Sequence, residues 1–133
     1  MRVLIVDDDE TFCQLMAEVL QNKGMQVVWT TDALAGYDMA NQQVYDVFIV
    51  DVRMPLISGT ELAEALKKDH PVTKVILVSA FADSSLLKLA KRIDVPLLSK
   101  PFSTTLLLEA VERVMNANSV IRRFHNGSQC KQA

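Results

Sequence analysis

The chain has 133 residues, half of them apolar, and a formal net charge of −2. A chain of this length buries about two-thirds of its unfolded surface, so one domain with a true core is expected. Its apolar runs stop at four or five residues, which excludes a membrane span of about 20 residues. Acidic residues gather at positions 7–10, which argues against direct nucleic-acid binding.

The start of the chain shows no secretory signal, because no basic segment followed by an apolar one precedes the first strand pattern. A cytoplasmic location is therefore expected. The spacing of Cys13 and Cys130 fits neither a metal site nor a disulfide framework, so both are predicted to be free thiols.

Short apolar runs alternate along the chain with segments in which apolar residues recur at helical spacing. Five strands are predicted, at residues 3–6, 25–30, 45–50, 72–78 and 95–99. A helix is predicted after each strand, at about residues 12–20, 34–43, 62–66, 86–93 and 107–114.

Local signals mark the ends of these helices. Gly24 is placed to end the first helix in a left-handed conformation, and Asp32 to cap the second. Residues 52–58 are predicted to form a loop before the third helix, which Pro71 closes. Ser103 is the expected cap of the fifth helix.

Pro96 lies inside the fifth predicted strand and places that strand at an edge of the sheet, because proline cannot donate to a ladder. Five strand–helix units with right-handed crossovers predict an α/β fold, a doubly wound parallel sheet with helices on both faces. Periodicity fades near residue 119. Residues 1–118 are therefore predicted to form the domain, and residues 119–133 a polar tail or a truncated linker.

Charged or hydroxyl side chains follow four of the five apolar runs: Asp7 and Asp8, Asp51, Ser79 and Lys100. Parallel strands end at one edge of a sheet, so these side chains should converge there. Adjacent carboxylates at about 4 Å repel by roughly 4 kcal/mol at an effective dielectric near 20. Mg²⁺ prefers oxygen ligands and would remove that repulsion. The pattern thus predicts a site for Mg²⁺ and a phosphoryl group.

Each of these residues also has a simpler interpretation. Asp9 and Glu10 are best explained as helix-capping residues. Asp51 alone would be a solvated loop carboxylate, Ser79 the first residue of a turn, and Lys100 a solvated cation. Together they fit a carboxylate nucleophile, a hydroxyl donor and a point charge directed at a phosphoryl group.

Four segments resemble the receiver domain of bacterial two-component response regulators. They are residues 3–9 (VLIVDDD), 47–55 (VFIVDVRMP), 75–80 (VILVSA) and 98–102 (LSKPF). The resemblance covers residues 1 to about 117. It implies a flavodoxin-like fold with strand order 2-1-3-4-5 and five flanking helices.

The resemblance also implies a role for each matching residue. Asp7 and Asp8 correspond to the Mg²⁺-binding pair and Asp51 to the phosphoacceptor, which also binds the metal. Arg53 would contribute its backbone carbonyl to the metal. Ser79 matches the hydroxyl that follows the phosphoryl group, and Lys100 the phosphate-binding lysine.

A member of this family would catalyse only its own phosphorylation and slow dephosphorylation. The implied partners are a sensor histidine kinase or histidine phosphotransfer protein as donor, and a downstream effector or output domain. Phosphorylation would alter the surface of the fourth helix, fifth strand and fifth helix, which also offers a route to a dimer. No nucleic acid or membrane is an expected partner of this domain.

The chain departs from the family pattern where the switch is read out. Leu97 stands where an aromatic residue usually changes rotamer, and Ile93-Asp94 where a Gly-Ala pair is common. The signalling surface should then respond through backbone or loop shifts. Phe81 is either the mobile aromatic of this chain or a core residue at the start of the fourth helix.

Two other functions are also compatible with parts of the sequence. Asp7 to Thr11 (DDDET) also matches the Asp-x-Asp-x-Thr motif of haloacid-dehalogenase-type phosphohydrolases, with Asp7 as nucleophile and Asp9 as general acid. Against this, no acidic pair follows Lys100, and residues 51–55 would have no role. The other alternative is an interaction module of receiver fold that is never phosphorylated.

Overall fold

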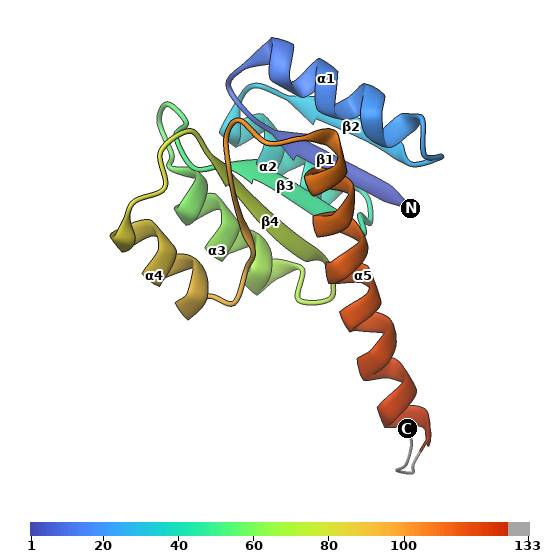
Figure 1. The fold of residues 1–133 in the computed structure, drawn as a ribbon. Coiled ribbons are helices and arrows are strands. Elements are labelled where there is room, and N and C mark those ends of the chain that lie inside the picture. The colour runs from blue at the N-terminus through green and yellow to red at the C-terminus, as the bar shows by residue number, and fades with distance from the viewer. Residues whose placement is uncertain (128–133) are drawn as a thin grey trace.

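The computed structural model describes the backbone of residues 1–127 and the side chains of residues 1–116. Its five strands form one parallel sheet in the order β2-β1-β3-β4-β5, which confirms the predicted fold (Figure 1). The strands are β1 (Arg2–Val6), β2 (Gln26–Thr30), β3 (Val47–Asp51), β4 (Lys74–Ser79) and β5 (Leu97–Ser99).

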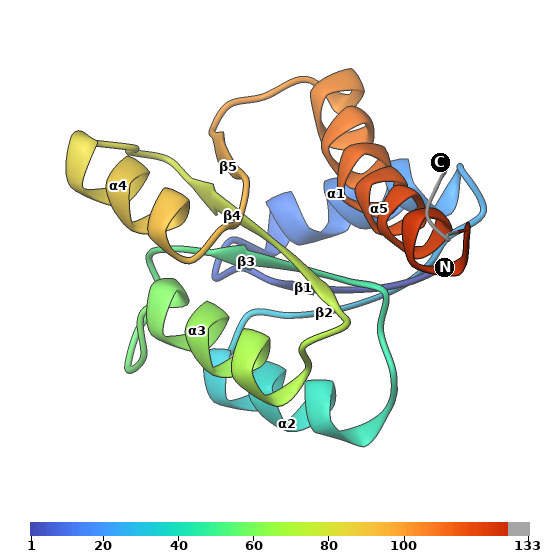
Figure 2. The ribbon, with the colours of Figure 1, turned by 90° about the horizontal axis from the view of Figure 1, so that it is seen from below.

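Five helices cover the two faces of the sheet. They are α1 (Glu10–Gln21), α2 (Ala33–Gln42), α3 (Gly59–Asp69), α4 (Ser84–Arg92) and α5 (Thr104–Gly127). Figure 2 shows α1 and α5 on one face and α2 and α3 on the other. Ala90 of α4 packs into the same apolar cluster as α2 and α3, so α4 completes that second layer.

Strand β1 shows why its apolar run is continuous. Val3 and Ile5 point into the cluster beneath α1 and α5, whereas Leu4 and Val6 point into the cluster beneath α2 and α3. All four side chains are fully buried. A central parallel strand is covered on both faces and therefore needs apolar residues at every position.

The predicted helix signals are confirmed. Gly24 adopts a φ of 88° after α1, the Asp32 carboxylate accepts from Ala35 N at 3.1 Å, and Ser103 Oγ accepts from Leu106 N at 3.1 Å. Ser58 and Glu61 form a capping box at the start of α3, which the sequence prediction missed.

The fifth strand is shorter than predicted. It begins at Leu97, so Pro96 precedes the strand instead of lying within it. The Pro96 carbonyl still accepts from Leu77 N at 2.9 Å, but the proline nitrogen has no hydrogen to donate. The predicted edge position of β5 is confirmed.

Helix α5 continues through residue 118 to Gly127 and runs past the body of the domain (Figure 1), so the predicted tail or linker is helical as far as Gly127. Residues 119–126 contain neither proline nor glycine, so the loss of apolar periodicity in the sequence does not break the helix. Residues 128–133, with Cys130, lie outside the described part. Within residues 1–127, no helix has the length and apolar character needed to cross a membrane.

Gly59, the first residue of α3, tests how closely the backbone at the start of α3 approaches the end of β3. A Cβ at this position would lie 1.8 Å from the Asp51 carbonyl oxygen, so Gly59→Ala should lower the free energy of unfolding by about 3 kcal/mol. Gly24→Ala is the matched control, since no atom lies within 4 Å of its added Cβ and only its positive φ costs about 1 kcal/mol. Urea unfolding followed by circular dichroism measures both. Equal losses in the two variants would contradict the close approach.

Candidate functional site

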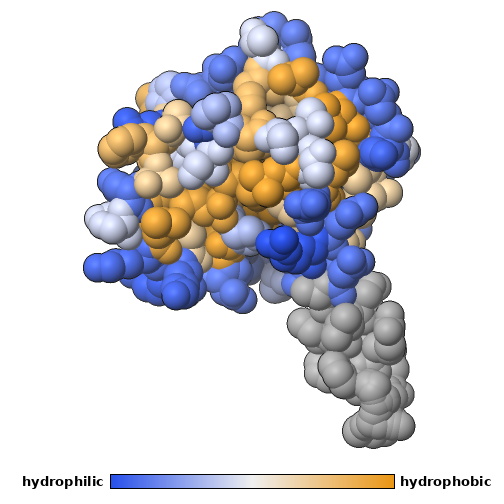
Figure 3. Space-filling model, in the orientation of Figure 1, coloured by the Kyte–Doolittle hydropathy of each residue, from blue (hydrophilic) through white to orange (hydrophobic). Residues whose placement is uncertain are grey.

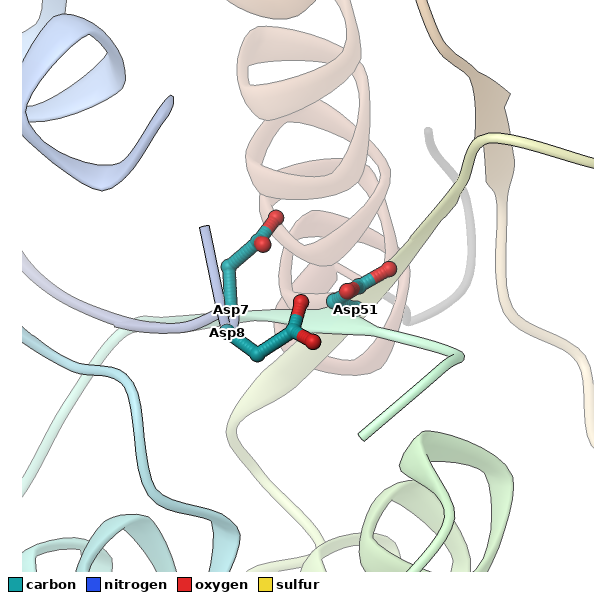
Figure 4. A group of neighbouring side chains, drawn as sticks. All are labelled: Asp7, Asp8 and Asp51. Atoms are coloured by element: carbon teal, nitrogen blue, oxygen red, sulfur yellow. The ribbon is translucent and has the colours of Figure 1, made fainter. Parts of the chain in front are cut away.

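Three carboxylates converge at the carboxyl edge of the sheet, as predicted. Val6 of β1 pairs with Val50 of β3, so Asp7 and Asp51 follow at neighbouring strand ends. One carboxylate oxygen from each of Asp7, Asp8 and Asp51 lies within 4.8 Å of the others. Figure 4 shows the three side chains gathered in one place. Asp7 and Asp51 are buried and Asp8 is exposed, so the group opens to solvent on the Asp8 side.

Lys100 reaches this group from the end of β5. Its Nζ lies 2.8 Å from Asp7 Oδ2 and 3.9 Å from Asp51 Oδ1. Its backbone N–H donates to the Ser79 carbonyl at 2.7 Å, which fixes the loop to the end of β4. The predicted meeting of ammonium and carboxylates is therefore confirmed as geometry. One ammonium beside three carboxylates leaves an excess of negative charge.

An aromatic side chain that the sequence prediction assigned only to the helical apolar face also contributes to the site. Lys100 Nζ lies 4.2 Å from the centroid of the Phe12 ring, within cation–π range. The Phe102 ring meets Phe12 edge-on, with centroids 5.4 Å apart. The ammonium of Lys100 thus contacts an aromatic ring as well as the carboxylates.

Two hydrogen bonds from the segment that follows Asp7 hold this residue in place. Its Oδ1 accepts from Asp9 N at 3.0 Å, and its carbonyl accepts from Cys13 Sγ at 3.2 Å. Burial, followed by the negative charge of Asp7, raises the pKa of the Cys13 thiol to about 12. Cys13 is therefore a protonated structural donor, consistent with the predicted free thiol.

The surroundings of Asp51 disfavour its ionised form. Burial raises its pKa to about 7, and the neighbouring Asp7 adds to the shift while Lys100 opposes it. Desolvation and like charge both disfavour the ionised form. The donor set consists of oxygen atoms carrying excess negative charge. These residues fit a hard divalent cation such as Mg²⁺.

Ser79 is brought to the edge of the site, but its hydroxyl bonds elsewhere. Ser79 Oγ donates to the Phe81 carbonyl at 3.0 Å and accepts from Phe81 N at 3.1 Å. Phe81 is 61% exposed and lies in the loop before α4, so the expectation that it is a core residue at the helix start is wrong. The Arg53 guanidinium lies 5.6 Å from the Phe81 ring centroid. The Arg53 carbonyl as a metal ligand stays a prediction.

Comparisons with known proteins agree with this geometry. Residues 3–112 match the family described as the response regulator receiver domain. A crystal structure of a CheY-like response regulator receiver domain protein from Methanospirillum hungatei has a TM-score of 0.85 at 25% identity, covering 89% of this chain and 95% of that chain. The predicted resemblance is confirmed.

Two curated relatives differ in length. The response regulator receiver protein CpdR of Brucella abortus is 26% identical over 122 residues, covering 87% of this chain and 98% of CpdR. A response regulator receiver protein of an Anaeromyxobacter species is 29% identical over 109 residues, covering 81% of this chain. This chain spans only 46% of the Anaeromyxobacter protein.

The raised pKa of Asp51 makes stability depend on pH. A carboxyl whose folded pKa lies above its unfolded value makes its full contribution to stability below the unfolded value, and that contribution is lost as pH rises from about 4 to about 7. Each pKa unit corresponds to about 1.4 kcal/mol. Without divalent cations, the free energy of unfolding of Asp51→Asn, taken relative to that of wild type, should therefore rise by about 2–3 kcal/mol as the pH is raised from 5 to 8. Urea unfolding in a chelator measures this, and a difference that is flat with pH would contradict it.

Proposed function

Because the chain belongs to the receiver domain family of response regulators, we propose that it is a phosphorylation-dependent switch of a two-component system in which Asp51 accepts the phosphoryl group. The observation that supports this most strongly is the position of Asp51. Its carboxylate ends β3 within 4.8 Å of carboxylate oxygens of Asp7 and Asp8, and Lys100 Nζ lies 3.9 Å from its Oδ1.

Asp51 is proposed to attack the phosphorus atom of a phosphohistidine. A bond forms from an Asp51 carboxylate oxygen to phosphorus, the P–N bond to the imidazole breaks, and the imidazole leaves with the electron pair and takes up a proton. Asp51 must be ionised to attack, so its raised pKa has to be lowered before transfer. Water later breaks the aspartyl phosphate, which resets the switch.

The carboxylates of Asp7, Asp8 and Asp51, with the Arg53 carbonyl, are the proposed ligands of Mg²⁺. When bound, this cation supplies positive charge that offsets the repulsion between the carboxylates and the incoming phosphoryl oxygens. Lys100 supplies a second positive charge, held by Asp7 at 2.8 Å and by the Phe12 ring. We propose that the ammonium moves from this pair to a phosphoryl oxygen.

Ser79 is proposed to report phosphorylation. Its hydroxyl lies at the end of β4, one residue beyond the pair Asp51 and Val78 in the ladder. A charged phosphoryl oxygen is a stronger acceptor than the Phe81 carbonyl that now takes the hydroxyl proton. Reorientation of this hydroxyl is the proposed first conformational step.

Receiver domains are signalling domains that interact with histidine kinases and output domains. For this chain, a sensor kinase or histidine phosphotransfer protein is the proposed donor, and the surface of α4, β5 and α5 the proposed output and dimerisation face. Leu87 of α4 and Leu106 of α5 are exposed. Figure 3 shows apolar residues gathered across the middle of the face that carries these helices. Such a patch fits a protein partner, and the cytoplasm is the proposed compartment.

The phosphohydrolase alternative is not favoured. Its general acid would be Asp9, yet an Asp9 carboxylate oxygen accepts from Phe12 N at 3.1 Å and caps α1. The family match over residues 3–112 accounts for the segment around Asp51 that this alternative leaves without a role.

Intact-mass analysis after incubation with acetyl phosphate and Mg²⁺ tests the proposal. We expect one labile phosphoryl group on wild type, and none on Asp51→Asn or on wild type in a chelator. Asp32→Asn is the matched control, because asparagine caps a helix about as well as aspartate and Asp32 caps α2. It should be phosphorylated like wild type.

Each other result of this experiment identifies a different alternative. A phosphoryl group that persists in Asp51→Asn and maps to Asp7 would support the phosphohydrolase. A wild-type chain that folds, binds Mg²⁺ and takes up no phosphoryl group would support the interaction module that is never phosphorylated.

A further inference from the structure

A contact between two side chains joins the loops on either side of the site. Arg53 lies two residues after Asp51, in the loop between β3 and α3, and Phe81 lies two residues after Ser79, in the loop between β4 and α4. The Arg53 guanidinium lies 5.6 Å from the Phe81 ring centroid. Both residues are exposed, so neither is held there by the core.

The backbone of Phe81 is bound to the hydroxyl on which the proposed switch depends. Ser79 Oγ donates to the Phe81 carbonyl at 3.0 Å and accepts from the Phe81 N–H at 3.1 Å. A hydroxyl has a single hydrogen to donate. If that hydrogen turns to a phosphoryl oxygen on Asp51, the Phe81 carbonyl necessarily loses its partner. Reorientation of the hydroxyl thus removes one of the two hydrogen bonds that hold the Phe81 backbone.

We propose that Arg53 and Phe81 form a latch, defined as the contact between their side chains, that holds the loop of residues 80–83 in its unphosphorylated conformation. This inference rests on the proposed function, since it concerns how phosphorylation of Asp51 is read out. The latch and the two Ser79 hydrogen bonds hold the same residue, one through its side chain and the other through its backbone.

In this chain, Leu97 stands where receiver domains usually have the aromatic residue that changes rotamer, so that position has no ring to respond to phosphorylation. Leu97 is partly buried and packs against the apolar cluster beneath α2 and α3. By contrast, Phe81 is two residues from Asp83, whose carboxylate accepts from Leu86 N at 2.9 Å and caps α4. Only Ala82 and Asp83 separate Phe81 from the start of α4 at Ser84, so we expect a displacement of Phe81 to reach the first turn of α4.

The expected effect of the latch is small but measurable. Cation–π contacts at exposed sites change an equilibrium by roughly two- to fivefold. A switch element responds only to contacts that differ between its two states. Loss of the latch should therefore raise the population of the released loop by about that factor before any phosphoryl group is present.

Amide spectra of the ¹⁵N-labelled chain test the latch. Beryllofluoride with Mg²⁺ on wild type defines the direction in which the signals of residues 80–83 move. Without beryllofluoride, Phe81→Leu and Arg53→Gln should each displace these signals along that direction, and the double variant no further than either single variant. Phe81→Tyr and Arg53→Lys keep the ring and the cation and should stay at the wild-type positions.

Leu56→Ala is the control, because it removes an exposed apolar side chain from the loop between β3 and α3 without touching the latch. It should leave the signals of residues 80–83 at their wild-type positions. Wild-type positions in both Phe81→Leu and Arg53→Gln would overturn the latch, as would additive displacements in the double variant. In that case a normal wild-type response to beryllofluoride leaves the proposed function standing. A wild type that gives no response overturns the proposed function, and the latch with it.

Discussion

The site depends on one electrostatic constraint: within the described side chains of residues 1–116, a cluster of three carboxylates, two of them buried, is offset by one nearby ammonium, that of Lys100. Lys100 contacts Asp7 at 2.8 Å and approaches Asp51 at 3.9 Å, and its ammonium lies 4.2 Å from the centroid of the Phe12 ring. The compensation is incomplete, because the pKa of Asp51 is raised to about 7. A group in this condition gains from any added positive charge. The arrangement therefore favours binding of a cation and, with it, a charged ligand.

The sheet is what imposes this arrangement. Adjacent parallel strands β1 and β3 end side by side, so residues directly after them cannot be far apart. The loop after β3 is drawn close by Gly59, whose N–H donates to the Val52 carbonyl at 2.8 Å. A rigid edge thus carries the charged residues, whereas the loop after β4 is fastened by a hydroxyl and an exposed side-chain contact. This division suits a switch, because the charged residues keep their positions while the loop after β4 can change its conformation.

The fold and the charged part of the site follow from the sequence, because apolar runs identify buried strands and strand ends converge. Asp7, Asp51 and Lys100 were predictable on that ground. The direction of the Ser79 hydroxyl was not, since it depends on the loop conformation around Phe81. Phe12 has the spacing of a core residue, and nothing in that spacing shows that it lies against Lys100. The extension of α5 to Gly127 was not predictable, because fading apolar periodicity does not itself end a helix that lacks proline and glycine.

The most direct test of this account is a titration of the aspartate carboxyl carbons by ¹³C NMR, with the Asp51 signal assigned by its loss in Asp51→Asn. Without divalent cations, Asp51 should titrate near pH 7, well above the ordinary value for a carboxyl. With saturating Mg²⁺ its pKa should fall below that ordinary value, because a cation favours the ionised form. An Asp51 carboxyl that titrates at its ordinary value in both conditions would contradict the claim that concentrated negative charge drives this site.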